Sequence, residues 1–279
     1  MTTTEAPDVT TLVDMERYPL DAPPAAAGVV AAAREQFGST GAVELPGFVT
    51  AEGVAALVAD AERLVPRAHR SAGIAGAYLE LPDPSWPSDH PRRRLSEFSV
   101  GAVAYDLIPT DSPLRALYEW DPLLHLVGAV LGRGPVHRYA DPFGALNLAV
   151  MGDGDQLHWH FDQTDFVVSL AIQAAESGGD FEVAPLIRGA GDEHYPDVAR
   201  VLDGDRSAVT TLPMTPGTLL IFAGRHSLHR VSPVRGTTYR HVGLLAYDTV
   251  PGTVGSELLR QSRYGRTVPF ECPPETWPV

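Results

Sequence analysis

A series of short apolar segments in the second half of the chain does most to limit its fold. From Val136 to Asp248, stretches rich in β-branched and aromatic residues follow one another, separated by Gly, Asp and Pro turns. They read VHRYA, ALNLAVM, LHWHF, DFVVSLAIQ, GDFEVAP, SAVTTLP, GTLLIFA, HRVSPV and YRHVGLLAYD. Short strands at such close spacing are typical of an antiparallel sandwich or barrel.

The first half of the chain shows the apolar spacing of helices instead. Residues 25–37 suit a helix, and Thr50 is the expected N-cap of a second one. Residues 112–132 predict a further helical stretch closed by Gly132. Between them, residues 66–96 contain LPDPSWPSDHP, which is too rich in Pro for regular structure. A connection of that length often covers a site.

We therefore predict an all-β core with a helical N-terminal portion, in a single domain. Its parts are an extended arm (1–24), a mainly helical support and lid (25–135), the β core (136–250) and a C-terminal tail (251–279). The 279 residues suffice for a buried core, and there is no internal repeat or separating linker.

Composition limits the partners. The net charge of −14 disfavours nucleic acid and anionic membrane surfaces. Cys272 is the only cysteine, so a metal site has to use His and carboxylate ligands. No apolar run has the length of a membrane span, and MTTTEAPDV lacks signal-peptide features. We expect a cytoplasmic protein that binds a small molecule, with the oligomeric state open and a homodimer among the options.

The stretch LHWHFDQTDF contains candidate metal ligands. His158, His160 and Asp162 alternate, so in a strand all three would point to one face. The row H-x-H-x-D is compatible with a two-zinc hydrolase site. The shorter H-x-D is also two-thirds of an iron site built from two imidazoles and one carboxylate, which leaves three positions open for other ligands.

A second imidazole would have to come from the stretch HSLHRVSPVRGTTYRH, which offers His226, His229 and His241. His229 opens a β-like run, whereas His226 lies in the turn before it, so His229 is the preferred ligand. Arg240 follows eleven residues after His229 (240 − 229). A neighbouring strand would bring its guanidinium beside the metal, where it suits a dicarboxylate. His241 would face the opposite side of that strand.

Region 136–248 resembles the Fe(II)- and 2-oxoglutarate-dependent dioxygenases. The matching features are H-x-D, SGGDFEVAP, PGTLLIFAGRHSLHRVSPV and the arginine that follows, in that order. The resemblance implies a double-stranded β-helix, the jelly-roll or cupin-like barrel, flanked by helices. It further implies that His160, Asp162 and His229 bind iron at the catalytic centre and that Arg240 binds 2-oxoglutarate. The implied cofactors are Fe(II), 2-oxoglutarate and O2.

Within that superfamily, the stretch from RYADPFGALNLAVM to SGGDFEVAP looks most like the branch acting on free amino acids and similar small metabolites. That branch includes radical halogenases, in which Gly or Ala replaces the carboxylate ligand and opens a site for chloride. This chain keeps Asp162. The resemblance therefore implies hydroxylation or another oxidation of an unactivated C–H bond, with release of succinate and CO2, in secondary metabolism.

Four more residues are candidates for binding. Asn147 and His158 are predicted to contact the cosubstrate; the alternatives are a strand-end amide and a hydrogen-bonded core histidine. Arg94 and Asp165 are predicted to contact the substrate; the alternatives are a solvated basic run and a turn carboxylate.

The rival function is a zinc-dependent hydrolase that uses the H-x-H-x-D row. Resemblance to the metallo-β-lactamase-like hydrolases would require a His directly after Asp162, where this chain has Gln163. It would also require αβ alternation, which the second half of the chain lacks. A binding-only cupin-like barrel is a further option, against which the intact ligand set and Arg240 argue.

Overall fold

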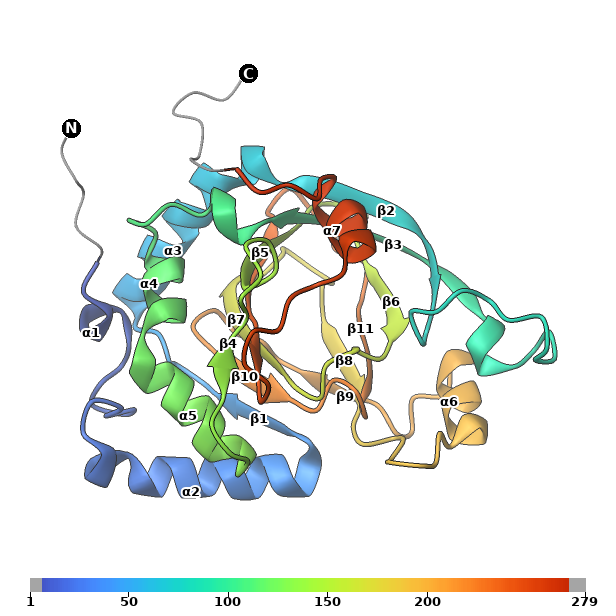
Figure 1. Cartoon of the computed structure of the whole chain (residues 1–279), viewed down its shortest axis with the longest axis horizontal. Coiled ribbons are helices and arrows are strands. Elements are labelled where there is room, and N and C mark those ends of the chain that lie inside the picture. The colour runs from blue at the N-terminus through green and yellow to red at the C-terminus, as the bar shows by residue number, and fades with distance from the viewer. Residues whose placement is uncertain (1–6, 271–279) are drawn as a thin grey trace.

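The computed structural model describes residues 7–270, which form helices around two main β-sheets, with a further two-stranded sheet (Figure 1). The α-helices are α1 (Val9–Leu12), α2 (Pro23–Thr40), α3 (Ala51–Leu64), α4 (Pro113–Glu119), α5 (Asp121–Leu131), α6 (Tyr195–Leu202) and α7 (Glu257–Tyr264). The strands are β1 (Ala42–Leu45), β2 (His69–Gly76), β3 (Leu95–Val103), β4 (His137–Arg138), β5 (Leu146–Met151), β6 (Leu157–His160), β7 (Val167–Gln173), β8 (Phe181–Ala184), β9 (Thr210–Leu212), β10 (Leu219–Phe222), β11 (Leu228–Val231), β12 (Arg240–Leu245) and β13 (Tyr247–Asp248).

The two main sheets form a barrel of antiparallel strands. The larger sheet has the order β1-β10-β7-β12-β5-β3-β2, and the smaller has the order β6-β11-β8-β9. Apolar side chains from both sheets pack together between them, including Met151 and Val242 from the larger and Phe181 and Val231 from the smaller. This arrangement confirms the predicted jelly-roll core.

Helices α2 to α5 cover the outer face of the larger sheet (Figure 1). Leu57 and Leu64 of α3 are buried there together with Leu148 and Leu170 of the sheet. Helix α3 begins where predicted, because the Gly53 N–H donates to the Thr50 hydroxyl over 3.0 Å. The helical half of the chain therefore supports the barrel from one side.

Every predicted β-like run contains a strand, but the predicted loop 66–96 differs from the structure. Its ends form β2 and the start of β3, which pair from His69 opposite Ala102 to Gly76 opposite Leu95. The β2 sequence HRSAGIAG has no apolar alternation, because most of its side chains are exposed. Its strand conformation comes from pairing with β3.

The predicted helical stretch 112–132 is broken into α4 and α5. Trp120 is extended, with φ −74° and ψ 116°. Pro122 explains the break, because proline lacks an N–H to donate and its ring would clash with the Tyr118 carbonyl in a continuous helix. Gly132 ends α5 in the left-handed conformation, as predicted.

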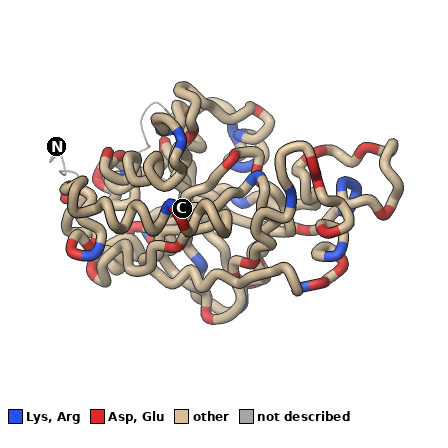
Figure 2. Tube along the Cα trace, turned by 90° about the horizontal axis from the view of Figure 1, so that it is seen from below, with Lys and Arg blue, Asp and Glu red and all other residues tan. Residues whose placement is uncertain are grey.

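The predicted terminal segments contain regular structure where they are described. The arm 1–24 includes α1 and the start of α2, and the tail 251–279 includes α7. Cys272 lies outside the described residues. Within residues 7–270, none of the helices combines the length and apolar character needed to cross a bilayer. Basic and acidic positions are interspersed along the trace, without a continuous basic stripe in the view of Figure 2.

Candidate metal centre

Two neighbouring strands of the smaller sheet bring three metal-ligating side chains together. β6 and β11 pair antiparallel, with His160 directly opposite His229. Asp162 follows β6 by two residues. One ligand atom from each of the three side chains lies within 4.8 Å of the others, and the two imidazole ring centroids are 4.3 Å apart.

Backbone carbonyls orient both imidazoles. Nδ1 of His160 lies 2.7 Å from the His158 carbonyl oxygen, and Nδ1 of His229 lies 2.8 Å from that of Ser227. With Nδ1 as the donor in each case, Nε2 keeps its lone pair. The two Nε2 atoms lie 3.8 Å and 3.3 Å from oxygens of Asp162. Both rings therefore present a metal-binding nitrogen to the carboxylate.

The electrostatics of this group fit a divalent cation. Oδ2 of Asp162 is buried and has no hydrogen-bond partner. Burial raises the pKa of the Asp162 carboxyl, against the opposing effects of His229 and Arg263. Burial, followed by repulsion from His229, lowers the pKa of His160 well below its usual value. Two imidazoles beside a carboxylate with an unsatisfied oxygen are the donor set that a metal ion completes.

The three candidate ligands are unequally exposed. The side chain of His229 is 6% exposed, whereas those of His160 and Asp162 are 13% and 23% exposed. A metal held by only these three residues would keep coordination positions for other ligands, as catalytic sites require.

Gly224 makes room for the Asp162 carboxylate. Its carbonyl accepts the Asp162 N–H over 3.1 Å. A Cβ atom on residue 224 would lie 2.2 Å from Asp162 Oδ2, a distance that forces the carboxylate to move.

We expect Gly224→Ala to weaken metal binding about 10- to 100-fold, the usual effect of disturbing groups that support a ligand. Titration with Co(II), followed by visible spectroscopy, measures this. Gly134→Ala is the matched control, because nothing lies within 4 Å of a Cβ at residue 134. Equal Co(II) affinity of the Gly224→Ala variant and the control would contradict the expectation.

Arg240 is a buried cation inside the barrel. It is 7% exposed, and its Nη1 lies 3.8 Å from Met151 Sδ. No carboxylate of the described residues lies within ion-pair distance of it. Burial lowers the pKa of Arg240 to about 10, with Asp180 opposing the shift from further away. A buried guanidinium without a counter-ion forms an anion site.

Glycine shapes the space around Arg240. Gly179, in the predicted SGGD stretch, has φ +68°, and a Cβ there would lie 2.9 Å from Arg240 Cδ. A side chain at residue 179 would therefore be strained and would also displace the arginine.

Asn147 lies inside the same barrel. It is 6% exposed and its Oδ1 has no hydrogen-bond partner. The structure therefore does not show the alternative, in which a backbone group would bond to Oδ1. On the β5–β12 pair, Asn147 lies opposite Leu244, and Met151 lies opposite Arg240. Asn147 and Arg240 thus lie at different ends of this strand pair. A cosubstrate contact of Asn147 stays a prediction.

His158 does not belong to the ligand group formed by His160, Asp162 and His229. Its Nε2 lies 3.3 Å from the Gly76 carbonyl oxygen. A β-bulge changes the expected alternation: His229 pairs with His160, but Val231 pairs with Leu157. The zinc-hydrolase reading of the H-x-H-x-D row is therefore not favoured.

His158 keeps a link to the surface. Its Nδ1 is buried without a partner, and burial lowers its pKa. It lines a crevice of about 320 Å³ together with Glu97, Trp159 and Arg230, among other residues. A contact of His158 with the cosubstrate stays a prediction.

The two predicted substrate residues are engaged in ion pairs. Arg94 pairs with Asp203, which follows α6, and its Nε donates to the Asp89 carbonyl over 3.0 Å. Asp165 accepts from Arg133 over 2.7 Å and from Arg225 over 2.6 Å. These pairings account for both side chains without a substrate, and substrate roles for them stay predictions.

His226 and His241, the other two histidines considered as ligands, lie where they were expected. His226 is in the turn before β11, where its N–H donates to the Ala223 carbonyl over 3.0 Å, and it is not part of the ligand group. His241 is fully buried, next to Arg240 on β12, and its ring stacks on Tyr239 at 5.8 Å.

Arg188 is a supporting residue that the sequence did not reveal. Its guanidinium carbon lies 3.9 Å from the centre of the Phe161 ring. Phe161 is the residue between His160 and Asp162. Its Nε donates to the Arg225 carbonyl over 2.6 Å, which braces the turn that contains Gly224. No motif surrounds Arg188, so only the folded chain shows this role.

The fold is similar to that of several solved structures. AviO1 from Streptomyces viridochromogenes aligns with a TM-score of 0.54 and 20% identity over 80% of this chain and 96% of that chain. The non-heme α-ketoglutarate-dependent epimerase SnoN from nogalamycin biosynthesis aligns with a TM-score of 0.54 and 15% identity over 80% and 83%. A prolyl hydroxylase from Trichoplax adhaerens aligns with a TM-score of 0.51 and 13% identity over 78% and 88%. No curated protein sequence matches the chain.

The likeness to these structures shows the jelly-roll fold, and the His-Asp-His group lies within it. The family model described as Halogenase D matches residues 25–253, and the chain belongs to that family. The match includes the ligands and Arg240. It also extends the relationship into the helical half, which the sequence motifs did not cover.

Proposed function

We propose that the protein is an Fe(II)- and 2-oxoglutarate-dependent oxygenase that hydroxylates an unactivated C–H bond of a free amino acid or an amino-acid-derived metabolite. The observation that carries the proposal is that one barrel contains two groups that each lack a partner. These are the Asp162 oxygen in the ligand group and the buried Arg240 cation. The solved complex of SnoN contains Fe3+, α-ketoglutarate and nogalamycin RO.

Each residue has a distinct role in this proposal. His160, Asp162 and His229 would hold iron, with each imidazole fixed by the backbone carbonyl two residues earlier in the chain. Arg240 would bind the distal carboxylate of 2-oxoglutarate through its planar fork. When bound, iron with 2-oxoglutarate and O2 supplies the oxidant, and succinate and CO2 are the co-products. The protein orients the substrate C–H bond and limits the access of water.

Anaerobic addition of Fe(II) and 2-oxoglutarate tests this proposal. A weak visible charge-transfer band that requires both additions is the expected result. Succinate release on admission of O2, stimulated by a panel of amino acids, then tests the substrate class. Tight zinc binding without the visible band would overturn the proposal.

The retained Asp162 is the reason to propose oxygenation in a family described as halogenases. Its carboxylate occupies the position that halogenases leave open for chloride. Asp162→Gly is expected to lose hydroxylation and to gain some chloride binding, because the cavity left beside the two imidazoles would admit an anion. Chloride-dependent change of the visible band and mass spectrometry of the products measure both effects. Unchanged hydroxylation by Asp162→Gly would contradict the ligand assignment.

A further inference from the structure

Arg188 joins the two chain segments that supply the candidate metal ligands. Its guanidinium carbon lies 3.9 Å from the centre of the Phe161 ring, inside the reach of about 6 Å for a cation–π contact. Its Nε donates to the Arg225 carbonyl over 2.6 Å, and its backbone N–H donates to the His226 carbonyl over 3.3 Å. Phe161 lies between two of the ligands, and the turn that contains Arg225 precedes the third. One side chain, 12% exposed, therefore contacts both segments.

Arg188 contacts these segments on the face of the smaller sheet that points away from the ligands. Phe161 packs with Leu228 of β11 and Val198 of α6, in a different apolar cluster from the one between the two main sheets. Phe161 and Leu228 each adjoin a ligand in the chain, and successive side chains of a strand point to opposite faces. Arg188 is therefore placed to hold the ligands and not to bind the metal itself.

Glu193 and Tyr78 connect Arg188 to the segment 77–94, which joins β2 to β3. Arg188 Nη1 donates to Glu193 over 2.8 Å, and Glu193 also lies 3.7 Å from Arg92 Nη2. Both guanidinium carbons contact the Tyr78 ring, that of Arg92 at 4.4 Å and that of Arg188 at 5.4 Å from its centre. Figure 1 shows the connection between β2 and β3 beside α6, and the two are in contact. Glu193 is thus the shared counter-ion of an arginine in this segment and of Arg188.

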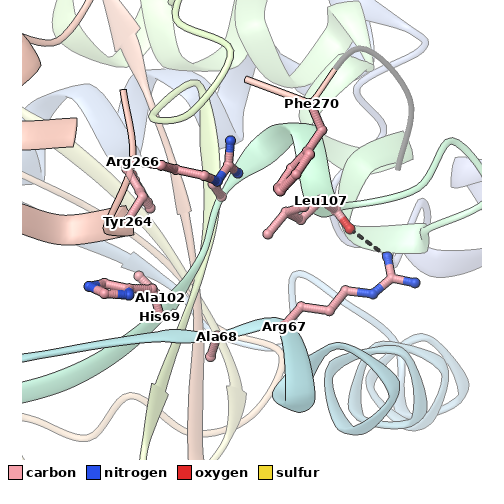
Figure 3. A pocket seen from close by; sticks show the side chains of 9 residues that line it. Arg67, Ala68, His69, Ala102, Leu107, Tyr264, Arg266 and Phe270 are labelled. Atoms are coloured by element: carbon pink, nitrogen blue, oxygen red, sulfur yellow. Dashed lines mark hydrogen bonds between the residues drawn. The ribbon is translucent and has the colours of Figure 1, made fainter. Parts of the chain in front are cut away.

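Other arginines also stack on aromatic rings, but with fewer links. Arg206 lies 5.2 Å from the centre of the Trp159 ring on β6, and it donates to carbonyls at and after the end of α6. Arg266 lies 4.5 Å from the centre of the Phe270 ring, and both line the crevice of about 230 Å³ in Figure 3. Within residues 7–270, neither arginine bonds to the turn before β11. Simultaneous contact with both ligand-bearing segments distinguishes Arg188 from these two.

We propose that Arg188 is a positioning residue for the metal centre, and that its ion pair with Glu193 makes this support depend on the segment 77–94. The inference rests on the proposed function, because it concerns the residues that hold iron there. A guanidinium suits the role, since its plane can lie over Phe161 while its edge donates to a carbonyl and to a carboxylate. Without it, Phe161 and the turn before β11 would be free to shift, and the three ligand atoms would no longer be held together.

Co(II) titration of the metal-free protein, followed by visible spectroscopy, tests the proposal. Arg188→Met should weaken Co(II) binding about 10- to 100-fold, the usual effect of losing a group that orients ligands, and should shift the Co(II) band. Arg188→Lys should recover part of the affinity, because it keeps a cation beside Glu193 but not the planar fork. Glu193→Gln should weaken binding about 2- to 5-fold, the effect of losing a partly exposed ion pair.

Arg206→Met is the matched control, because Arg206 also stacks on an aromatic ring of the ligand-bearing strand. It should bind Co(II) as the unmodified protein does. Amide hydrogen exchange of the metal-free protein adds a measurement that needs no metal. The Phe161 N–H donates to the Ala77 carbonyl over 2.8 Å, and the Asp162 N–H donates to the Gly224 carbonyl over 3.1 Å. Both protons should exchange faster in Arg188→Met and at unchanged rates in Arg206→Met.

Equal Co(II) affinity and band position in Arg188→Met and the unmodified protein would overturn the proposal. So would an equal loss of affinity in Arg206→Met. Unchanged affinity in Glu193→Gln would overturn the dependence on the segment 77–94. Thermal melting establishes that each variant folds, and Arg188→Lys carries the same comparison if Arg188→Met does not fold. Failure of the proposed function has a different signature: the unmodified protein would lack the Fe(II)–2-oxoglutarate band, whereas the exchange rates would still report on Arg188.

Discussion

His229→Ala is expected to abolish succinate formation and to reduce metal affinity by several orders of magnitude. The substitution removes one of only two imidazoles in the ligand group. It also removes the imidazole whose Nε2 lies 3.3 Å from Asp162 Oδ2. Co(II) or Fe(II) titration measures affinity directly. A metal-dependent rise in melting temperature gives an independent measure, because a ligand that binds only the native state stabilises it.

His226→Ala is the control for this substitution. His226 lies three residues earlier, in the turn, and contributes no ligand. Its variant should keep the metal-dependent rise in melting temperature, whereas His229→Ala should lose it. If the two variants behave in the opposite way, the ligand assignment on β11 is wrong.

Arg240→Met is expected to have opposite effects on cosubstrate binding and on stability. Loss of a buried charged partner should weaken 2-oxoglutarate binding about 100-fold or more. The same change should raise the free energy of unfolding of the cosubstrate-free protein. Burial lowers the pKa of Arg240 to about 10, so the folded state disfavours the charged guanidinium at neutral pH. That penalty is present below the folded pKa and fades as the pH rises above it.

Urea unfolding with and without 2-oxoglutarate measures both effects. The unmodified protein should gain stability on addition of 2-oxoglutarate, and Arg240→Met should not. Arg240→Lys keeps the charge but loses the planar fork, so it should bind 2-oxoglutarate with intermediate affinity. A less stable cosubstrate-free Arg240→Met protein would show that the guanidinium contributes packing that outweighs its desolvation.

The sequence was sufficient for the barrel and for the three candidate ligands that the structure brings together, because both depend on local patterns. Alternating apolar runs predicted the strands, and H-x-D with HRVSPV predicted the ligands. The strand β2 was not predictable, because its HRSAGIAG sequence pairs through the backbone alone. The break at Trp120 was readable in principle from Pro122, whose missing N–H is a local property.

A supporting residue outside the motifs was missed. Arg188 stacks on Phe161, which lies between His160 and Asp162 in the chain. Arg188 is not part of a motif, since its neighbours in space come from other elements. The β-bulge beside His158 could not be predicted from the sequence either, because only the pairing of β6 with β11 shows it.

The pairing of His160 opposite His229 joins residues that are far apart in the chain. A slip of one residue between β6 and β11 would turn His229 to the outside of the barrel. A misassembled molecule would then lack the centre altogether, while its helical half could remain intact. Metal uptake during refolding would therefore report when the smaller sheet reaches its native alignment, and iron supply would favour correctly assembled molecules over slipped ones.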